Sequence, residues 1–174
     1  MARKGIRLYG DSILRARCQP VVATAASTRA LVTDLFDTMY SAGGVGLAAC
    51  QIGVAARVFV ADCSALVPGS SPVALINPEL VSKGTPRLAE EGCLSFPDLY
   101  LKVQRPEEAH LAYETQEGLR KELQAKGLLA RVLLHELDHL DGVLFVDAQT
   151  ALSRTLLAAR LWSFKRRSRR GELA

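Results

Sequence analysis

The sequence of 174 residues contains no long apolar run, and nowhere does it approach the roughly 20 uninterrupted apolar residues that a membrane-spanning helix requires. It opens MARKGIRLYG, without the apolar stretch of a signal peptide. Its four cysteines (Cys18, Cys50, Cys63 and Cys93) lack the paired spacing of a disulfide framework. We therefore expect a cytoplasmic protein of the reducing cytosol, with no membrane partner.

The sequence also lacks an internal repeat, a linker and any sign of a second domain. With 49% hydrophobic and 23% charged residues, its composition is that of an ordinary globular protein, so residues 1–174 are expected to form one catalytic domain. The net charge is only +4, but five basic residues gather in Lys165-Arg-Arg-Ser-Arg-Arg170. This basic C-terminal tail, residues 165–174, is either a solvated end or a contact for an anionic partner such as RNA; we expect no DNA partner.

Three segments have the apolar spacing of helices: residues 27–41, 127–140 and 150–164. Ser27 or Thr28 can cap the first of them. The second is apolar on most sides, so it should run through the core. A catalytic motif on that helix would be held rigidly.

Four segments have the composition of strands: residues 57–62, 73–77, 109–113 and 119–123. Pro78 should stop the second, and a Gln116-Glu-Gly118 turn should join the last two as a hairpin. Because helices precede, interrupt and follow these strands, we expect an α+β fold. Its antiparallel or mixed sheets would pack around a central buried helix that carries the HExxH motif, with a further helix at the C-terminus.

Two of the three histidines lie four positions apart, in His135-Glu-Leu-Asp-His139. On a helix they are offset by about 40° and about 6 Å along the axis, so both imidazoles can reach one ion. Glu136 projects about 100° away from His135, outside the ligand set but close enough to exchange protons with a water there. Burying these groups would cost several kcal/mol without a common partner, and a metal ion is the simplest one. The segment predicts a metal-dependent hydrolase; a chance pattern or a structural metal site is the alternative.

A hydrolytic site needs a third protein ligand, and a thiolate suits a divalent transition metal. Cys93 is the strongest candidate because Gly92, which precedes it, allows close approach of the backbone. Cys50 is its rival. Cys18 and Cys63 are expected to be small buried apolar residues.

Three segments in this order resemble the motifs of peptide deformylases: Gly44-Val-Gly-Leu-Ala-Ala-Cys-Gln51, Glu91-Gly-Cys-Leu-Ser95 and His135-Glu-Leu-Asp-His139. Weaker similarity extends the likeness over residues 7–147. An HExxH motif alone says little about the substrate, whereas the ordered triple is specific.

The resemblance implies removal of the formyl group from the N-terminal formyl-methionine of nascent chains, with release of formate. It assigns Cys93, His135 and His139 as ligands of one divalent metal ion, with a position left to water. Glu136 would act as general base and then as general acid. The Gln51 side-chain amide and the Leu94 backbone N–H would stabilise the oxyanion.

The resemblance further points to Fe(2+) as the native ion, although the ligand set also accepts Zn(2+), Ni(2+) or Co(2+). The methionine side chain would lie in an apolar slot at the first motif. Its lining is expected to include Gly44, Val45, Gly46, Gly92 and Val132, which core packing alone would also explain. N-formylmethionyl nascent peptides are the expected partners, and the basic tail would contact the ribosome.

The sequence departs from the family pattern in two places. Leu134 stands where many members carry Gln before HExxH, and residues 96–100 differ from the Val-Pro-Gly frequent after the second motif. Asp138 either orients a ligand histidine or faces solvent. We also hypothesise that Glu91 pairs with Arg105 near the site.

Two other functions compete with deformylation. An HExxH endopeptidase with another third ligand would tolerate loss of Cys93. A catalytically inactive relative that binds ribosomes through its tail would have no physical reason to keep all three ligands together with Glu136 and Gln51.

Overall fold

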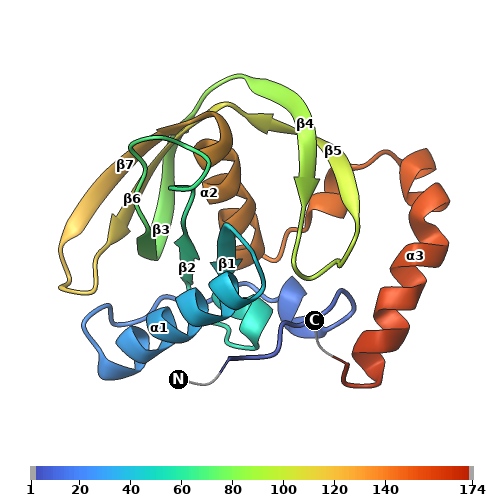
Figure 1. Ribbon diagram of the computed structural model, residues 1–174, viewed down its shortest axis with the longest axis horizontal. Coiled ribbons are helices and arrows are strands. Elements are labelled where there is room, and N and C mark those ends of the chain that lie inside the picture. The colour runs from blue at the N-terminus through green and yellow to red at the C-terminus, as the bar shows by residue number, and fades with distance from the viewer. Residues whose placement is uncertain (1–2, 173–174) are drawn as a thin grey trace.

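The computed structural model describes residues 3–172, so the four terminal residues of the expected domain, 1–2 and 173–174, lie outside the described residues (Figure 1). Within the described part the α-helices are α1 (Ala26–Ser41), α2 (Gly127–Leu140) and α3 (Ala151–Arg169). The strands are β1 (Gly46–Ala48), β2 (Val58–Ala61), β3 (Val73–Lys83), β4 (Pro86–Gly92), β5 (Tyr100–Pro106), β6 (Glu108–Glu114) and β7 (Arg120–Lys126). Short 3-10 helices are η1 (Ser12–Arg15), η2 (Ala49–Ile52) and η3 (Phe145–Ala148).

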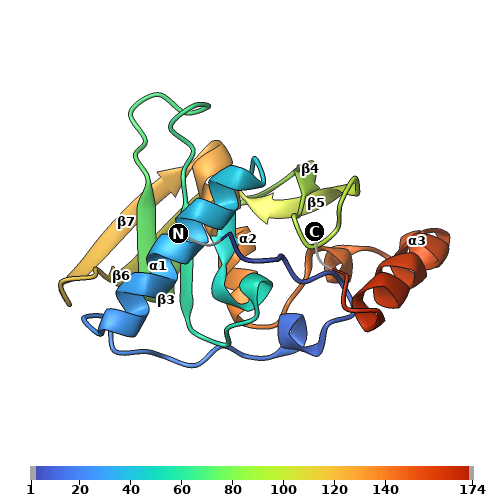
Figure 2. The ribbon, with the colours of Figure 1, turned by 60° about the horizontal axis from the view of Figure 1, so that its bottom comes forward.

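The strands form two antiparallel sheets, which confirms the α+β class. Five strands pair in the order β1-β2-β3-β6-β7, and β4 pairs with β5 in a separate two-stranded sheet. In both views α2 lies between the larger sheet and the β4–β5 hairpin (Figures 1 and 2).

Alternation along β2 explains how the larger sheet holds helices on both faces. Val58 and Val60 pack in one apolar cluster with residues of α1, whereas Phe59 and Ala61 belong to a second cluster with residues of α2. Successive side chains of a strand point to opposite faces, so a strand buried on both sides must be apolar throughout. All four residues of β2 are buried.

The helix α2 confirms the prediction for residues 127–140. Its buried residues are Ala130, Arg131, Val132, Leu133, Leu134, His135, Glu136, Leu137, His139 and Leu140. Burial on nearly every side is what an almost continuous apolar segment predicts. Polar groups on such a helix must find partners inside the protein, because water does not reach them.

Several predicted boundaries were wrong. Pro78 does not stop β3, which continues to Lys83, because a register shift between Ile76 and Glu79 places the proline at an irregularity where the ladder needs no N–H. Ala25, not Ser27 or Thr28, is the N-cap of α1. The strands β1, β4 and β5 were not predicted.

The C-terminal helix is longer than predicted. It runs to Arg169, so four of the five basic residues of the tail lie in the helix. Cations in the last turn of a helix interact favourably with its dipole. Along α3, within the described chain, Phe164 is the buried residue, and Leu152, Leu156 and Trp162 are exposed. None of the helices in residues 3–172 has the length and hydropathy to span a membrane.

Candidate active site

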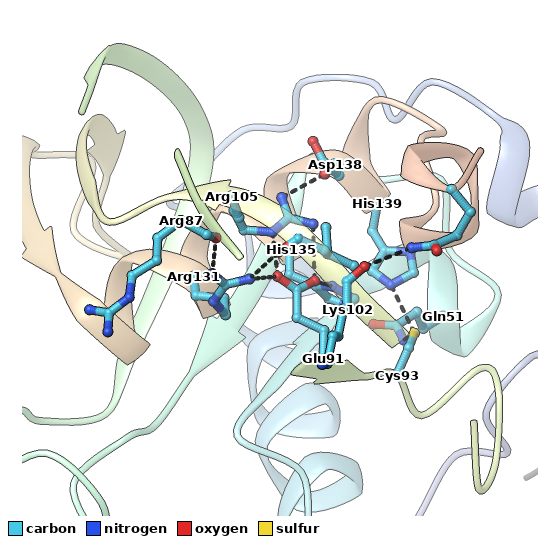
Figure 3. Close-up of polar contacts among 12 residues, drawn as sticks. Gln51, Arg87, Glu91, Cys93, Lys102, Arg105, Arg131, His135, Asp138 and His139 are labelled. Carbon is cyan, nitrogen blue, oxygen red and sulfur yellow. Dashed lines mark hydrogen bonds and ion pairs between the residues drawn. The ribbon is translucent and has the colours of Figure 1, made fainter. Parts of the chain in front are cut away.

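One group of potential metal ligands forms where the β4–β5 hairpin meets α2. Cys93 follows the last residue of β4, and His135 and His139 lie one turn apart on α2. One ligand atom from each of the three lies within 4.8 Å of the others, and Cys93 Sγ is 3.3 Å from His139 Nε2. Both histidines are buried and Cys93 is half-buried (Figure 3). The structure thus brings together the three residues predicted as ligands.

The two histidines have different surroundings. His135 Nδ1 lies 3.1 Å from Glu91 Oε2, which leaves Nε2 for the site. Burial favours a neutral ring and lowers the pKa of His139 well below its usual value. Burial also disfavours the charged form of His135, but the neighbouring Cys93 and Glu91 outweigh it and raise that pKa. A cation bound beside Cys93 would replace the proton of His135.

Glu91, the last residue but one of β4, accepts contacts from three basic side chains. Oε1 accepts from Arg105 Nε at 2.7 Å and from Arg131 Nη1 at 2.6 Å, while Oε2 faces His135 and Arg105 Nη2. Burial would raise the pKa of Glu91, but hydrogen bonds from His135 and Arg105 lower it to about 2. The predicted pairing of Glu91 with Arg105 is confirmed. The suggestion that Asp138 orients a ligand histidine is wrong: Asp138 accepts from Arg105 at 2.7 Å, and Glu91 contacts the histidine.

Glu136 lies against the first glycine-rich segment. A Cβ on Gly46 would lie 2.5 Å from Glu136 Oε1, so only glycine leaves room for the carboxyl group. Glu136 Oε2 is buried and has no hydrogen-bond partner among the described residues. Burial raises the pKa of Glu136 to about 7. A carboxyl group of this pKa can both accept and release a proton at neutral pH.

The amide of Gln51 is oriented by a contact at each end. Its Oε1 accepts from the Ala48 backbone N–H at 2.8 Å, and its Nε2 lies 3.2 Å from Ser95 Oγ and 3.7 Å from Cys93 Sγ. The N–H end of the amide therefore faces the ligand group. Leu94, the other predicted donor, lies directly after Cys93.

A cleft of about 650 Å³ opens beside this group. The five residues predicted to bind substrate all line it, namely Gly44, Val45, Gly46, Gly92 and Val132. Five residues with predicted metal-binding or catalytic roles also line it: Gln51, Cys93, Leu94, His135 and Glu136. A Cβ on Gly44 would lie 2.7 Å from Leu94 Cδ1, and one on Gly92 would lie 2.7 Å from Tyr100 Cε1. The glycines are therefore needed where side chains crowd the backbone of the cleft.

Neither Cys50, the alternative third ligand, nor Leu134, the residue before the HExxH motif, is part of the Cys93–His135–His139 group. Cys50 is fully buried, and its thiol donates to the His139 carbonyl at 3.5 Å. Leu134 packs in the apolar core. Arg131 is the residue near the site that the sequence did not single out; its only signal is a charged side chain within an apolar helix.

A thiol, two imidazoles, a buried carboxyl group and an oriented amide around one cleft are the functional groups of a metal-dependent hydrolase of the HExxH class. The sequence of this chain matches the model of the polypeptide deformylase family over residues 3–155. It is 45% identical over 154 residues to a peptide deformylase of Nitrosococcus oceani, with coverage of 88% of this chain and 91% of the relative. It is 44% identical over 143 residues to a peptide deformylase of Picosynechococcus, with coverage of 82% of this chain and 76% of the relative.

The fold agrees with the sequence match. The crystal structure of a peptide deformylase from Legionella pneumophila superposes with a TM-score of 0.86 at 41% identity, covering 95% of this chain and 96% of the other. The chain belongs to the polypeptide deformylase family.

Proposed function

We propose that this protein is a peptide deformylase, which hydrolyses the N-formyl group of the N-terminal formyl-methionine of newly made proteins and releases formate. One observation carries the proposal: this chain, a member of the family, holds one donor atom from each of Cys93, His135 and His139 within 4.8 Å of the others, and Cys93 and His135 line the cleft. Glu136 and Gln51 line the same cleft.

The residues fit a divalent metal ion. Each of Cys93, His135 and His139 offers one donor atom, and a set of one sulfur and two nitrogens suits Fe(2+), our preferred native ion, as well as Zn(2+), Ni(2+) or Co(2+). When bound, such an ion lowers the pKa of water at the site toward about 7 and polarises a carbonyl group. The buried helix α2 is the proposed central scaffold, because it supplies two donors and Glu136 from one rigid element.

Glu136 is the proposed proton carrier. Its carboxylate takes a proton from the attacking water and delivers it to the amine as the C–N bond of the formamide breaks. A pKa near 7 allows both transfers. The Oε2 atom, which has no partner among residues 3–172, is free to receive the proton.

Gln51 and Leu94 are the proposed oxyanion donors. As water adds to the formyl carbon, negative charge develops on the carbonyl oxygen and requires donors that are already oriented. The Ala48 backbone holds the Gln51 amide with its N–H end toward Cys93. The Leu94 backbone N–H would supply the second bond.

The methionine side chain is proposed to occupy the apolar part of the cleft near Val45 and Val132. The peptide backbone is proposed to lie strand-fashion along the first motif at Gly44 and Gly46, with Gly92 lining the same cleft. Because the formyl group is small, the cleft must hold the rest of the substrate to place the carbonyl.

Two wider proposals concern the cell. The protein is proposed to act in the cytoplasm as a single catalytic domain, and the basic end of α3 is proposed to contact ribosomal RNA. Four basic residues in the last turns of α3 and a fifth, Arg170, at its C-cap support that contact.

The test is formate release from a formyl-Met peptide by anaerobically prepared protein with a quantified metal content. Glu136→Gln should lower kcat by about 10²- to 10⁴-fold while the metal content stays unchanged. Glu122→Gln is the matched control, since Glu122 is an exposed carboxylate paired with His110. Undiminished turnover by the Glu136 variant would refute the mechanism, and cleavage of internal peptide bonds would favour an endopeptidase.

A further inference from the structure

Arg131 is a buried cation on a helix that is otherwise packed in the apolar core. Its guanidinium donates to Glu91 Oε1 at 2.6 Å, to the Val103 carbonyl at 3.1 Å and to the Arg87 carbonyl at 2.8 Å. One side chain of α2 therefore holds a carboxylate of β4 and a backbone carbonyl from each strand of the hairpin. Figure 3 shows Arg131 beside Glu91 and Arg87. A planar guanidinium suits such divergent contacts, whereas a lysine ammonium is a single point of charge.

Arg131 belongs to one face of α2. Residues 131, 135 and 138 are spaced by four and three positions, which places them on the same side of the helix. Arg131 and His135 contact Glu91 directly, and Asp138 contacts it through Arg105. This face of α2 thus contacts the β4–β5 hairpin at three positions along the helix, twice on β4 and once on β5.

The β4–β5 hairpin depends on contacts with α2 for a fixed position. Within residues 3–172 its two strands pair only with one another, and an isolated two-stranded sheet is marginally stable in water. Cys93 follows Glu91 by two residues, whereas His135 and His139 are fixed in the core. Any rotation of the hairpin over α2 would therefore move Cys93 relative to both histidines.

We propose that Arg131 is a positioning residue, which locks the β4–β5 hairpin onto α2 and so sets Cys93 at ligand distance from His135 and His139. This inference rests on the proposed function, because it assumes that the three residues bind one ion. Arg105 does not duplicate this role. It lies on the hairpin itself, and its contact on α2 is the half-exposed Asp138.

The experiment follows chelator-induced loss of Co(2+) from the loaded full-length protein through its thiolate-to-cobalt absorption band. Arg131→Met removes all three contacts, and Arg131→Lys keeps the charge but cannot reproduce the fork. Arg120→Met is the matched control, because Arg120 makes an exposed pair with Glu79 on β3. Hydrogen exchange of the hairpin amides and thermal unfolding are measured on the same samples.

We expect Arg131→Met to bind Co(2+) about 10- to 100-fold more weakly, with faster exchange in β4 and β5, and Arg131→Lys to lie in between. A Co(2+) affinity of Arg131→Met equal to that of the wild type would overturn the proposal. If the melting temperature alone falls, Arg131 has only a structural role. If Arg131→Met does not fold, the affinity of Arg131→Lys decides in the same way. A wild-type protein without the thiolate band would instead refute the proposed metal site.

Discussion

Gly46 and Glu136 pack so closely that position 46 has no room for a side chain. A Cβ there would lie 2.5 Å from Glu136 Oε1 and 2.9 Å from Val132 Cγ1. Both neighbours belong to the buried helix α2, which cannot yield without disturbing the core. The first motif thus holds the carboxyl group in place by packing as well as by chemistry.

Gly46→Ala should therefore lower both kcat and the free energy of unfolding. Overpacking of this kind costs about 1–3 kcal/mol, and a displacement of about 1 Å at a catalytic group can cost about 100-fold in rate. Formate release and urea unfolding would be compared with those of Gly84→Ala. Gly84 lies away from the cleft, and an added Cβ would meet the Glu108 side chain at 3.1 Å. Equal kcat for both variants would contradict the prediction.

Cys93→Ala should lose most of its metal during purification, whereas Cys50→Ala should retain it. Only Cys93 places a donor atom beside both histidines; the Cys50 thiol donates to the carbonyl of His139. Metal content per chain after dialysis against a weak chelator distinguishes the two. Retention by Cys93→Ala would reopen the endopeptidase alternative.

Gln51→Ala should reduce kcat by about 10²- to 10³-fold, the usual effect of removing one oxyanion donor, with little change in metal content. Gln149→Ala provides the control, since Gln149 is an amide that donates to the Lys102 carbonyl at the surface. The comparison requires steady-state kinetics with a formyl-Met peptide. A change in KM alone would assign Gln51 to substrate binding.

The Arg15–Asp147 pair should give stability that depends on pH. Burial acts to raise the pKa of Asp147, but the hydrogen bond from Arg15, 2.9 Å between Nη2 and Oδ1, and that from the Leu144 N–H make the net shift downward. A lowered native pKa contributes stability above the unfolded value of about 3.9, and this contribution is lost as the pH falls through the native pKa.

Asp147→Asn should therefore destabilise the protein at pH 7 by no more than about 1 kcal/mol, because the pair is partly exposed. Urea unfolding at pH 7 and pH 2.5 would show the difference from the wild type shrinking in acid. A difference that persists at pH 2.5 would mean that shape, not charge, matters at this position.

Ribosome binding should depend on charges at the end of α3 and not on the helix itself. Truncation after Phe164 would be a poor test of the charges, because it also removes contacts that Lys165 makes with the N-terminal segment. Lys165 Nζ lies 5.4 Å from the centre of the Tyr9 ring, and the Lys165 backbone packs against Gly10. A better variant replaces the other four basic residues by Gln and so keeps the contacts of Lys165. These four residues are Arg166, Arg167, Arg169 and Arg170. Co-sedimentation with ribosomes should weaken, with a shallower salt dependence; unchanged binding would exclude the tail.

The sequence predicted α2 and the two histidines that we propose as ligands because the signal was local. One apolar segment of helical length carried two histidines and a glutamate in fixed spacing. It did not predict β4 or β5; in β4 five of the seven residues are exposed, and no run of apolar residues marks the strand. Their strand character comes from pairing with each other and packing on α2, which no local pattern encodes.

The roles of charged residues around the ligands were harder to predict. Asp138 sits beside His139 in sequence, but its side chain turns to Arg105 on the hairpin. Glu91 reaches His135 across 44 positions of sequence, so only the fold could show that contact. The same holds for Arg131, whose partners all lie on β4 and β5.

Gln51, Cys93 and His139 come from three well-separated segments, and α2 is the last of these to be synthesised. The same helix fills the space between the larger sheet and the hairpin (Figure 1). Until it arrives, apolar residues of the larger sheet such as Phe59 and Leu111 lack the α2 side chains that share their cluster, and the contacts of Glu91 with Arg131 and His135 cannot form. The core cluster that contains α2 and the Cys93–His135–His139 group therefore form together, and a chain interrupted before His139 would lack both.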